Sequence, residues 1–168
     1  MKQMLGFTLI EIMIALLLVA IVLTVGVPSL RDFIHNNQAA SETNALLAAL
    51  NSARGTAIER GIPVAVCASS NGTSCLSTSG CAGATDWSSG WLIFTDNPGG
   101  TACVKDGSDV VLHVGAGFSG GSLKGTVAGV QYLPSGLRLN ATTATFTLKL
   151  GKQTRIVTLT PSGQASSQ

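Results

Sequence analysis

The hydrophobic residues of the chain follow three successive patterns, and the first is an almost uninterrupted apolar run. Between Gly6 and Leu30 only Glu11 carries an ionisable side chain before the uncharged stretch Ile12–Leu30. A helix over that stretch, at about 1.5 Å per residue, is about 28 Å long, enough to cross the hydrocarbon core of a bilayer. The run therefore predicts a membrane-spanning helix, and an acidic side chain such as Glu11 is energetically unfavourable in one unless it has a partner.

The second pattern, over residues 31–60, is that of an amphipathic helix. Apolar side chains recur at spacings of three and four residues with polar side chains around them; they are Leu46, Leu47, Leu50, Ala53, Ala57 and Ile58. Gly61 and Pro63 end the pattern. Together the two patterns predict one helix on the order of 80 Å long, with a bend or local melting at Pro28, because proline removes a helical hydrogen bond.

The third pattern is short apolar segments rich in Val, Thr and Leu, separated by Gly, Pro and Asn. Strands are predicted at 62–68, 90–96, 109–114, 126–133, 143–150 and 153–160. Gly151 and Lys152 form the predicted hairpin turn between the last two. The sequence thus predicts an α+β protein in which the long helix packs on an antiparallel β head at 62–168. A head of about 100 residues cannot cover the whole helix, so its first half requires lipid or other helices.

Composition narrows the classes of function. Charged residues make up only 11% of the chain, and the net charge is +2. These values argue against a disordered polyelectrolyte and against a dedicated nucleic-acid-binding protein.

The four cysteines are Cys67, Cys75, Cys81 and Cys103. They contain no C-x-x-C spacing and no histidine stands among them in a zinc-finger arrangement, so a zinc site is not predicted. After an N-terminal export segment, two disulfides formed in an oxidising compartment are the better interpretation. Three pairings are open. We prefer Cys67–Cys75 with Cys81–Cys103, because the first closes a compact loop that leaves the first strand.

No constellation for catalysis, a metal or a cofactor is predicted. Residues 115–120 match G-x-G-x-x-G, but more glycines follow where a dinucleotide site needs a helix, and no acidic residue follows Asp109. We therefore interpret this stretch as a flexible connection between strands. His35 and His113 have no nucleophile–base arrangement. The aspartates at 86, 96, 106 and 109 lack the spacing of a calcium loop. The sequence therefore predicts a protein that is not an enzyme.

The N-terminal segment Gly6-Phe7-Thr8-Leu9-Ile10-Glu11 resembles the signature of type IV pilins and type II secretion pseudopilins. The resemblance implies a leader peptide at 1–6, a transmembrane and filament-core helix at 7–30, and an amphipathic half at 31–61. It also implies that a prepilin peptidase cuts after Gly6 and methylates Phe7. Glu11 then acquires a partner, since its carboxylate can pair with the α-amino group of a neighbouring subunit's Phe7 in the filament core. The alternatives are a plain membrane anchor and a Glu11 side chain that reaches the membrane surface.

The head also carries a resemblance. Trp87-Ser88-Ser89-Gly90-Trp91-Leu92-Ile93-Phe94-Thr95-Asp96 resembles the W-x-x-G-W-x-[IV]-F-x-D segment of the GspH/FimT family, which has the type IV pilin fold. Arg60–Val64 and Tyr132–Gly136 are similar to its helix–strand junction and a later turn. We expect the two tryptophans to pack in the core.

This resemblance implies a minor pilin at or near the tip of a type IV pilus that helps to initiate pilus assembly. Its partners would be other minor pilins and the major pilin. It would first cross the bacterial inner membrane once, with its C-terminal domain in the periplasm, and then enter the filament. A minor pseudopilin of a type II secretion system is the alternative.

A second alternative is a DNA-binding minor pilin for natural transformation. Such FimT-like proteins carry a basic G-R-x-R motif near the C-terminus, but here Gln164 and Ser166 stand in place of the arginines. Lys149, Lys152 and Arg155 remain as a basic cluster that could attract phosphate weakly. DNA binding is therefore possible but not favoured.

Overall fold

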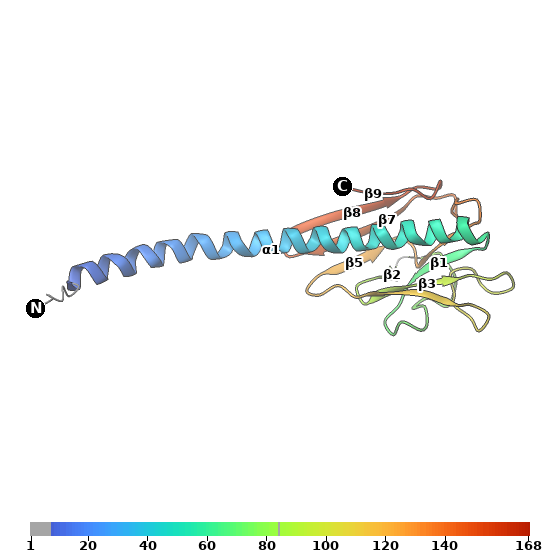
Figure 1. Cartoon of the computed structure of the whole chain (residues 1–168), viewed down its shortest axis with the longest axis horizontal. Helices are drawn as coiled ribbons and strands as arrows, with labels where there is room; N and C mark the ends of the chain where they lie inside the picture. The colour runs from blue at the N-terminus through green and yellow to red at the C-terminus, as the bar shows by residue number, and fades with distance from the viewer. Residues whose placement is uncertain (1–7, 84) are drawn as a thin grey trace, which may run out of the picture.

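A long helix carries two antiparallel β-sheets along its C-terminal half (Figure 1). The computed structural model describes residues 8–83 and 85–168. Helix α1 (Leu9–Arg60) begins after Thr8, whose side chain caps its first turn, and ends at Gly61. Gly61 has a left-handed φ of 65°, which glycine adopts without steric penalty. The predicted α+β fold and the single helix through both halves of the N-terminal segment are confirmed.

The local melting predicted at Pro28 is wrong for this chain, because α1 continues through it. Figure 1 shows only a gentle curve in this half of the helix. The proline ring removes one helical hydrogen bond and crowds the carbonyl four residues earlier, but it also holds φ near the helical value, so the helix can curve at this point without melting. The nearby Thr24 hydroxyl donates to the carbonyl of Ile21 over 2.8 Å.

Among the described residues, nine strands form two antiparallel sheets. The first has the order β4-β3-β1-β6 and the second the order β2-β5-β7-β8-β9. Their bounds are β1 Val64–Ala68, β2 Thr85–Asp86, β3 Gly90–Thr95, β4 Val111–Ala116, β5 Ser122–Gly125, β6 Gly129–Tyr132, β7 Ala144–Leu150, β8 Gln153–Leu159 and β9 Ala165–Ser167. Helix α1 packs on strands of both sheets, so the two sheets share one helix as their common support.

Three strands were missed by sequence reasoning, namely β2, β5 and β9. All three are short and rich in Ser, Thr, Gly or Lys, so no apolar alternation marks them. The interpretation of 115–120 as a flexible connection is wrong at its start, because Gly115 and Ala116 belong to β4. A Cβ at Gly115 would lie 2.1 Å from the indole of Trp91. Glycine is needed there because Trp91 lies directly on the strand.

The main core lies between α1 and the two sheets. The buried apolar side chains of the helix are those of Ala39, Leu46, Ala49, Leu50, Ala53 and Ala57. Trp87 packs edge-on against Phe146, with ring centroids 5.0 Å apart, and its Nε1–H donates to the carbonyl of Val127 over 3.0 Å. Trp87 is thus a packing residue, as expected.

A smaller core covers the outer face of the first sheet. Alternate residues of β1 and β3 point away from α1, and they include Ala65, Leu92 and Phe94, which are fully buried. The loops that cover them are held by the disulfides Cys67–Cys75 and Cys81–Cys103. This is the pairing preferred from the sequence. Loops rich in Ser, Gly and Thr have few apolar groups of their own to pack, so the disulfides hold them on the sheet.

Candidate functional site

The first half of α1 projects from the head with its apolar side chains uncovered (Figure 1). Leu9, Ile12, Leu16, Val19 and Leu23 are each more than half exposed. Among the described residues α1 is the one helix long and apolar enough to cross a membrane, and no residue of its most apolar stretch is buried by the rest of the chain. A surface of this size requires a cover from outside the molecule.

Glu11 lies in the first turn of α1 and closes a capping box with Thr8. The Glu11 amide donates to the Thr8 hydroxyl over 3.3 Å, and the Thr8 amide donates to the Glu11 carboxylate over 3.4 Å. The Thr8 amide thereby gains an acceptor, and the Glu11 amide, which also donates to the Thr8 carbonyl over 3.2 Å, gains a second one. Thr8 was not singled out from the sequence, although T-x-x-E before an apolar run is the signal of such a cap. The predicted processing residues Gly6 and Phe7 lie outside the described residues.

The β7–β8 hairpin contacts α1 at the point where the helix leaves the head. The turn residue Gly151 has a φ of 57°, and a Cβ there would lie 2.7 Å from His35 Nδ1. The adjacent Lys152 Nζ lies 3.4 Å from Asp32 Oδ2, in a surface pair whose side chains are 82% and 50% exposed. A pair this exposed stabilises the fold little. It does, however, place a cation next to the end of the apolar helix half.

The other two residues of the predicted basic cluster point in different directions. Arg155 Nη2 donates to Asn36 Oδ1 on α1 over 2.9 Å, so this guanidinium is held against the helix. Lys149 alternates with the buried Leu148 and Leu150, and its exposed side chain stands on the opposite face of the sheet. The structure therefore brings Lys149, Lys152 and Arg155 to one end of the head without arranging them as one phosphate hook.

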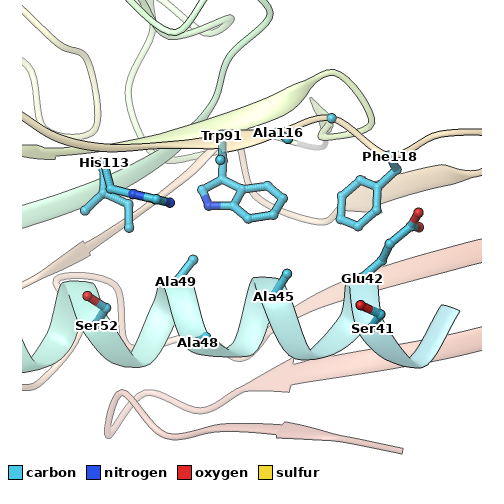
Figure 2. Close-up of a pocket in the computed structure, with 13 residues that line it drawn as sticks. Ser41, Glu42, Ala45, Ala48, Ala49, Ser52, Trp91, His113, Ala116 and Phe118 are labelled. Carbon is cyan, nitrogen blue, oxygen red and sulfur yellow. The ribbon is translucent and has the colours of Figure 1, made fainter. Parts of the chain in front are cut away.

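A groove of about 500 Å³ lies between α1 and the β3–β4 pair. Figure 2 shows Trp91 over Ala45 and Ala49, with His113 and Glu42 towards opposite ends of the groove. Trp91 is 4% exposed and packs against Phe118, but its Nε1 has no hydrogen-bond partner. The groove is mainly apolar, and its two titratable groups are separated by the aromatic side chains.

The loop after β3 is organised by buried and half-buried aspartates. Asp96 Oδ2 accepts from the amide of Cys103 over 2.7 Å, and Asp109 accepts from the amides of Asn97 and Asp106. Burial of Asp96 raises the pKa of its carboxyl above the ordinary value; the Cys103 amide opposes this shift, and the nearby Asp109 and Asp106 add to it. These carboxylates accept backbone hydrogen bonds, and among the residues that the structure describes no cluster of three His, Cys, Asp or Glu side chains could hold a metal ion.

Replacing Asp96 by asparagine is expected to change the pH dependence of stability. Because the folded pKa is raised, the stabilisation linked to this proton is complete below the ordinary aspartate pKa, about 3.9, and is lost as pH rises through the folded value. The unfolding free energy of the native chain relative to Asp96→Asn should therefore fall as pH rises. Denaturant unfolding of both proteins at a series of pH values measures this difference in unfolding free energy. A difference that stays constant with pH would contradict the raised pKa of Asp96.

Comparison with known proteins gives two family matches. The model of the family described as type II transport protein GspH matches residues 42–163, and that of the prokaryotic N-terminal methylation motif matches residues 1–27. No curated protein sequence matches the chain significantly.

Two solved structures have a similar fold, and both are of the type IV minor pilin FimU of Pseudomonas aeruginosa. The crystal form in space group P21 has a TM-score of 0.59 at 18% identity, over 81% of this chain and 92% of that one. The form in space group P65 has a TM-score of 0.53 at 19% identity, over 79% and 91%. At this level of identity the similarity shows the fold.

Proposed function

We propose, because this chain belongs to the GspH family and carries the N-terminal methylation motif, that it is a minor pilin of a type IV pilus. In this proposal it enters the filament at or near the tip, contacts other minor pilins and the major pilin, and helps to start polymerisation. In this role the protein acts through the surfaces that contact other subunits, and it does not catalyse a reaction.

The observation that carries the proposal is the uncovered apolar half of α1. Between Leu9 and Leu30 the large hydrophobic side chains whose exposure is described are 42–76% exposed. The head buries none of these side chains, so the segment needs a cover from outside the molecule, and two different environments supply it in turn. Lipid covers it while the chain is in the inner membrane, with the head in the periplasm, and similar helices cover it in the filament.

Glu11 supports the same proposal through its position. In the filament core a lone carboxylate is desolvated, and a salt bridge with the methylated amino group of a neighbouring Phe7 gives it a partner. In one stacking register both charges are paired, while in a slipped register both are left without partners. Glu11 therefore selects the register in which subunits join.

Processing of the N-terminus is the direct test. Co-expression of the full chain with a prepilin peptidase is expected to give a protein whose intact mass begins at Phe7 and includes one methyl group. Omitting the peptidase should leave the mass that begins at Met1. A chain that stays uncut in the presence of active peptidase, while a known prepilin is cut in the same cells, would contradict the proposal.

A pseudopilin of a type II secretion system is the second candidate, and the description of the matched family favours it. The similarity in fold to the minor pilin FimU favours the pilus. Both systems use the same signal, helix and head, so the neighbouring genes are the discriminating observation. Genes for other minor pilins would support the pilus, and genes for secretion components would support the pseudopilin.

DNA binding for transformation remains the third candidate, and the positions of the basic residues make it weaker. Lys152 and Arg155 are engaged by Asp32 and Asn36 of α1. They also lie at the end of the head nearest the apolar helix half. In a membrane-inserted chain this end faces the bilayer, which restricts the approach of a DNA duplex.

A further inference from the structure

The end of the head that faces the apolar helix half carries a hollow whose lining changes from apolar to cationic. Val27 and Pro28 form its apolar side, and Arg31 and Lys152 lie at its charged side, together with Asp32 and His35. The hollow is formed by two elements far apart in the sequence, α1 and the turn between β7 and β8, which lie side by side where the helix emerges (Figure 1).

The order of these side chains along α1 matches the order of groups in a phospholipid. If Leu9–Leu30 crosses the hydrocarbon layer, at about 33 Å for its length, then Arg31 follows at the level of the phosphates. Phe33 and Ile34, which are 64% and 52% exposed, continue the apolar surface into the interfacial layer. Val27 and Pro28 then border acyl chain, while Arg31 and Lys152 border phosphate.

The charges around the hollow favour an anion. Four cations lie at this end of the head, namely Arg31, Lys149, Lys152 and Arg155, and the side chain of Lys152 is 82% exposed. Among the described residues of α1 that lie near them, Asp32 is the acidic one, and the next carboxylate along the helix, Glu42, is about 15 Å further up the axis. Asp32 neutralises one cation and leaves an excess of positive charge.

We propose that this hollow binds the phosphate of an anionic phospholipid between Arg31 and Lys152 while the chain is in the membrane. The lipid holds the β7–β8 turn on the bilayer surface, and so orients the head before assembly. The inference rests on the membrane-inserted state of the proposed function. It also gives Lys152 a ligand other than DNA, since its position at the bilayer surface favours lipid phosphate.

Hydrogen exchange of the full chain in vesicles tests this proposal. The probe is the rate of exchange of the turn amides at 151–153, compared between phosphatidylcholine vesicles and vesicles that also contain phosphatidylglycerol. We expect slower exchange in the anionic vesicles, and the slowing should be lost at high salt. Arg31→Gln and Lys152→Gln are each expected to lower the equilibrium constant for the protected state about five-fold.

Two further variants separate lipid binding from a purely structural role of the turn. Asp32→Asn removes the carboxylate that competes with phosphate for Lys152. This variant should therefore increase the difference in turn-amide exchange rate between the two kinds of vesicle. A merely structural ion pair would instead loosen the turn equally in both. Lys105→Gln, in the loop at the opposite end of the head, is the matched charge control and should change nothing.

The outcomes distinguish this inference from the proposed function. A chain extracted from the vesicles by alkaline carbonate is not membrane-inserted, and both ideas then fail. An inserted chain whose turn exchanges equally in both vesicles overturns the lipid site alone. Protection of the turn by duplex DNA in phosphatidylcholine vesicles, without any by phosphatidylglycerol, would assign these cations to nucleic acid and also overturn it.

Discussion

Replacing Glu11 by alanine is expected to leave membrane insertion and cleavage after Gly6 intact and to reduce incorporation into filaments by about a hundred-fold or more, the usual scale for breaking a buried ion pair. The change leaves the amino group of a neighbouring Phe7 without its partner in the filament core. Immunoblotting of sheared filaments and of the membrane fraction measures incorporation, as the ratio of the protein in filaments to the protein left in the membrane. Normal incorporation of Glu11→Ala would contradict the pairing proposed for this carboxylate.

The capping box makes a sharper version of this experiment possible. Alanine at position 11 removes both the charge and the side-chain acceptor for the Thr8 amide. Glutamine removes the charge but can still accept that hydrogen bond, since capping boxes use Glu or Gln at this position. If pairing with Phe7 is the main role, Glu11→Gln should assemble as poorly as Glu11→Ala. Restoration of assembly by glutamine would mean that the helix cap is what matters.

Removal of the Cys81–Cys103 disulfide is expected to have the largest effect on the stability of the head. The bond closes a sequence separation of 22 residues, and its cysteines are 7% and 0% exposed. Loop-closure entropy alone predicts a loss of about 3 kcal/mol for a double change to alanine. For a head of about 100 residues this corresponds to a fall in Tm of roughly 15 °C.

The reason for this large effect is the smaller core under the loops. Without the bond the loop around Cys103 can lift from the sheet, and Leu92 and Phe94, both fully buried, become exposed to water. Thermal unfolding of the detergent-solubilised full chain, followed by circular dichroism, measures the shift. An unchanged Tm in Cys81→Ala/Cys103→Ala would refute this account.

The Cys67–Cys75 bond is the matched comparison. It closes a separation of only 8 residues, so the same entropy argument gives about 2.5 kcal/mol. Its partner Cys75 lies in the loop directly after β1, and the strand itself remains paired with β3 and β6 when the bond is removed. Cys67→Ala/Cys75→Ala should therefore lower Tm less than removal of the longer bridge.

Much of the fold was predictable from the sequence because it rests on patterns that a chain carries locally. The apolar run and the amphipathic repeat predicted one helix, and β1, β3, β4, β6, β7 and β8 were predicted from short segments rich in Val, Thr and Leu. β2, β5 and β9 were not, since strands of two to four residues with Ser, Gly and Lys owe their conformation to the partner strand. The same is true of Gly115, which looked like a flexible linker and lies under Trp91.

The candidate site divides in the same way. Glu11 stands out in the sequence because one acid in a long apolar run contradicts its surroundings. The basic residues Lys149, Lys152 and Arg155 also stand out in the sequence, but the sequence does not show which residues surround them. Only the packing of the β7–β8 turn on α1 places them beside Asp32 and Asn36, at the end of the apolar helix half.

By itself the sequence determined that this protein has a helix too long and too apolar for its own head, with a single acid near its start. These features can be read from the spacing and composition of residues that are close together in the sequence. The tertiary structure alone decided which surfaces lie at the two ends of the head. It brought a hairpin turn near residue 151 against residue 35, and such a contact depends on how two sheets share one helix, which no local pattern records.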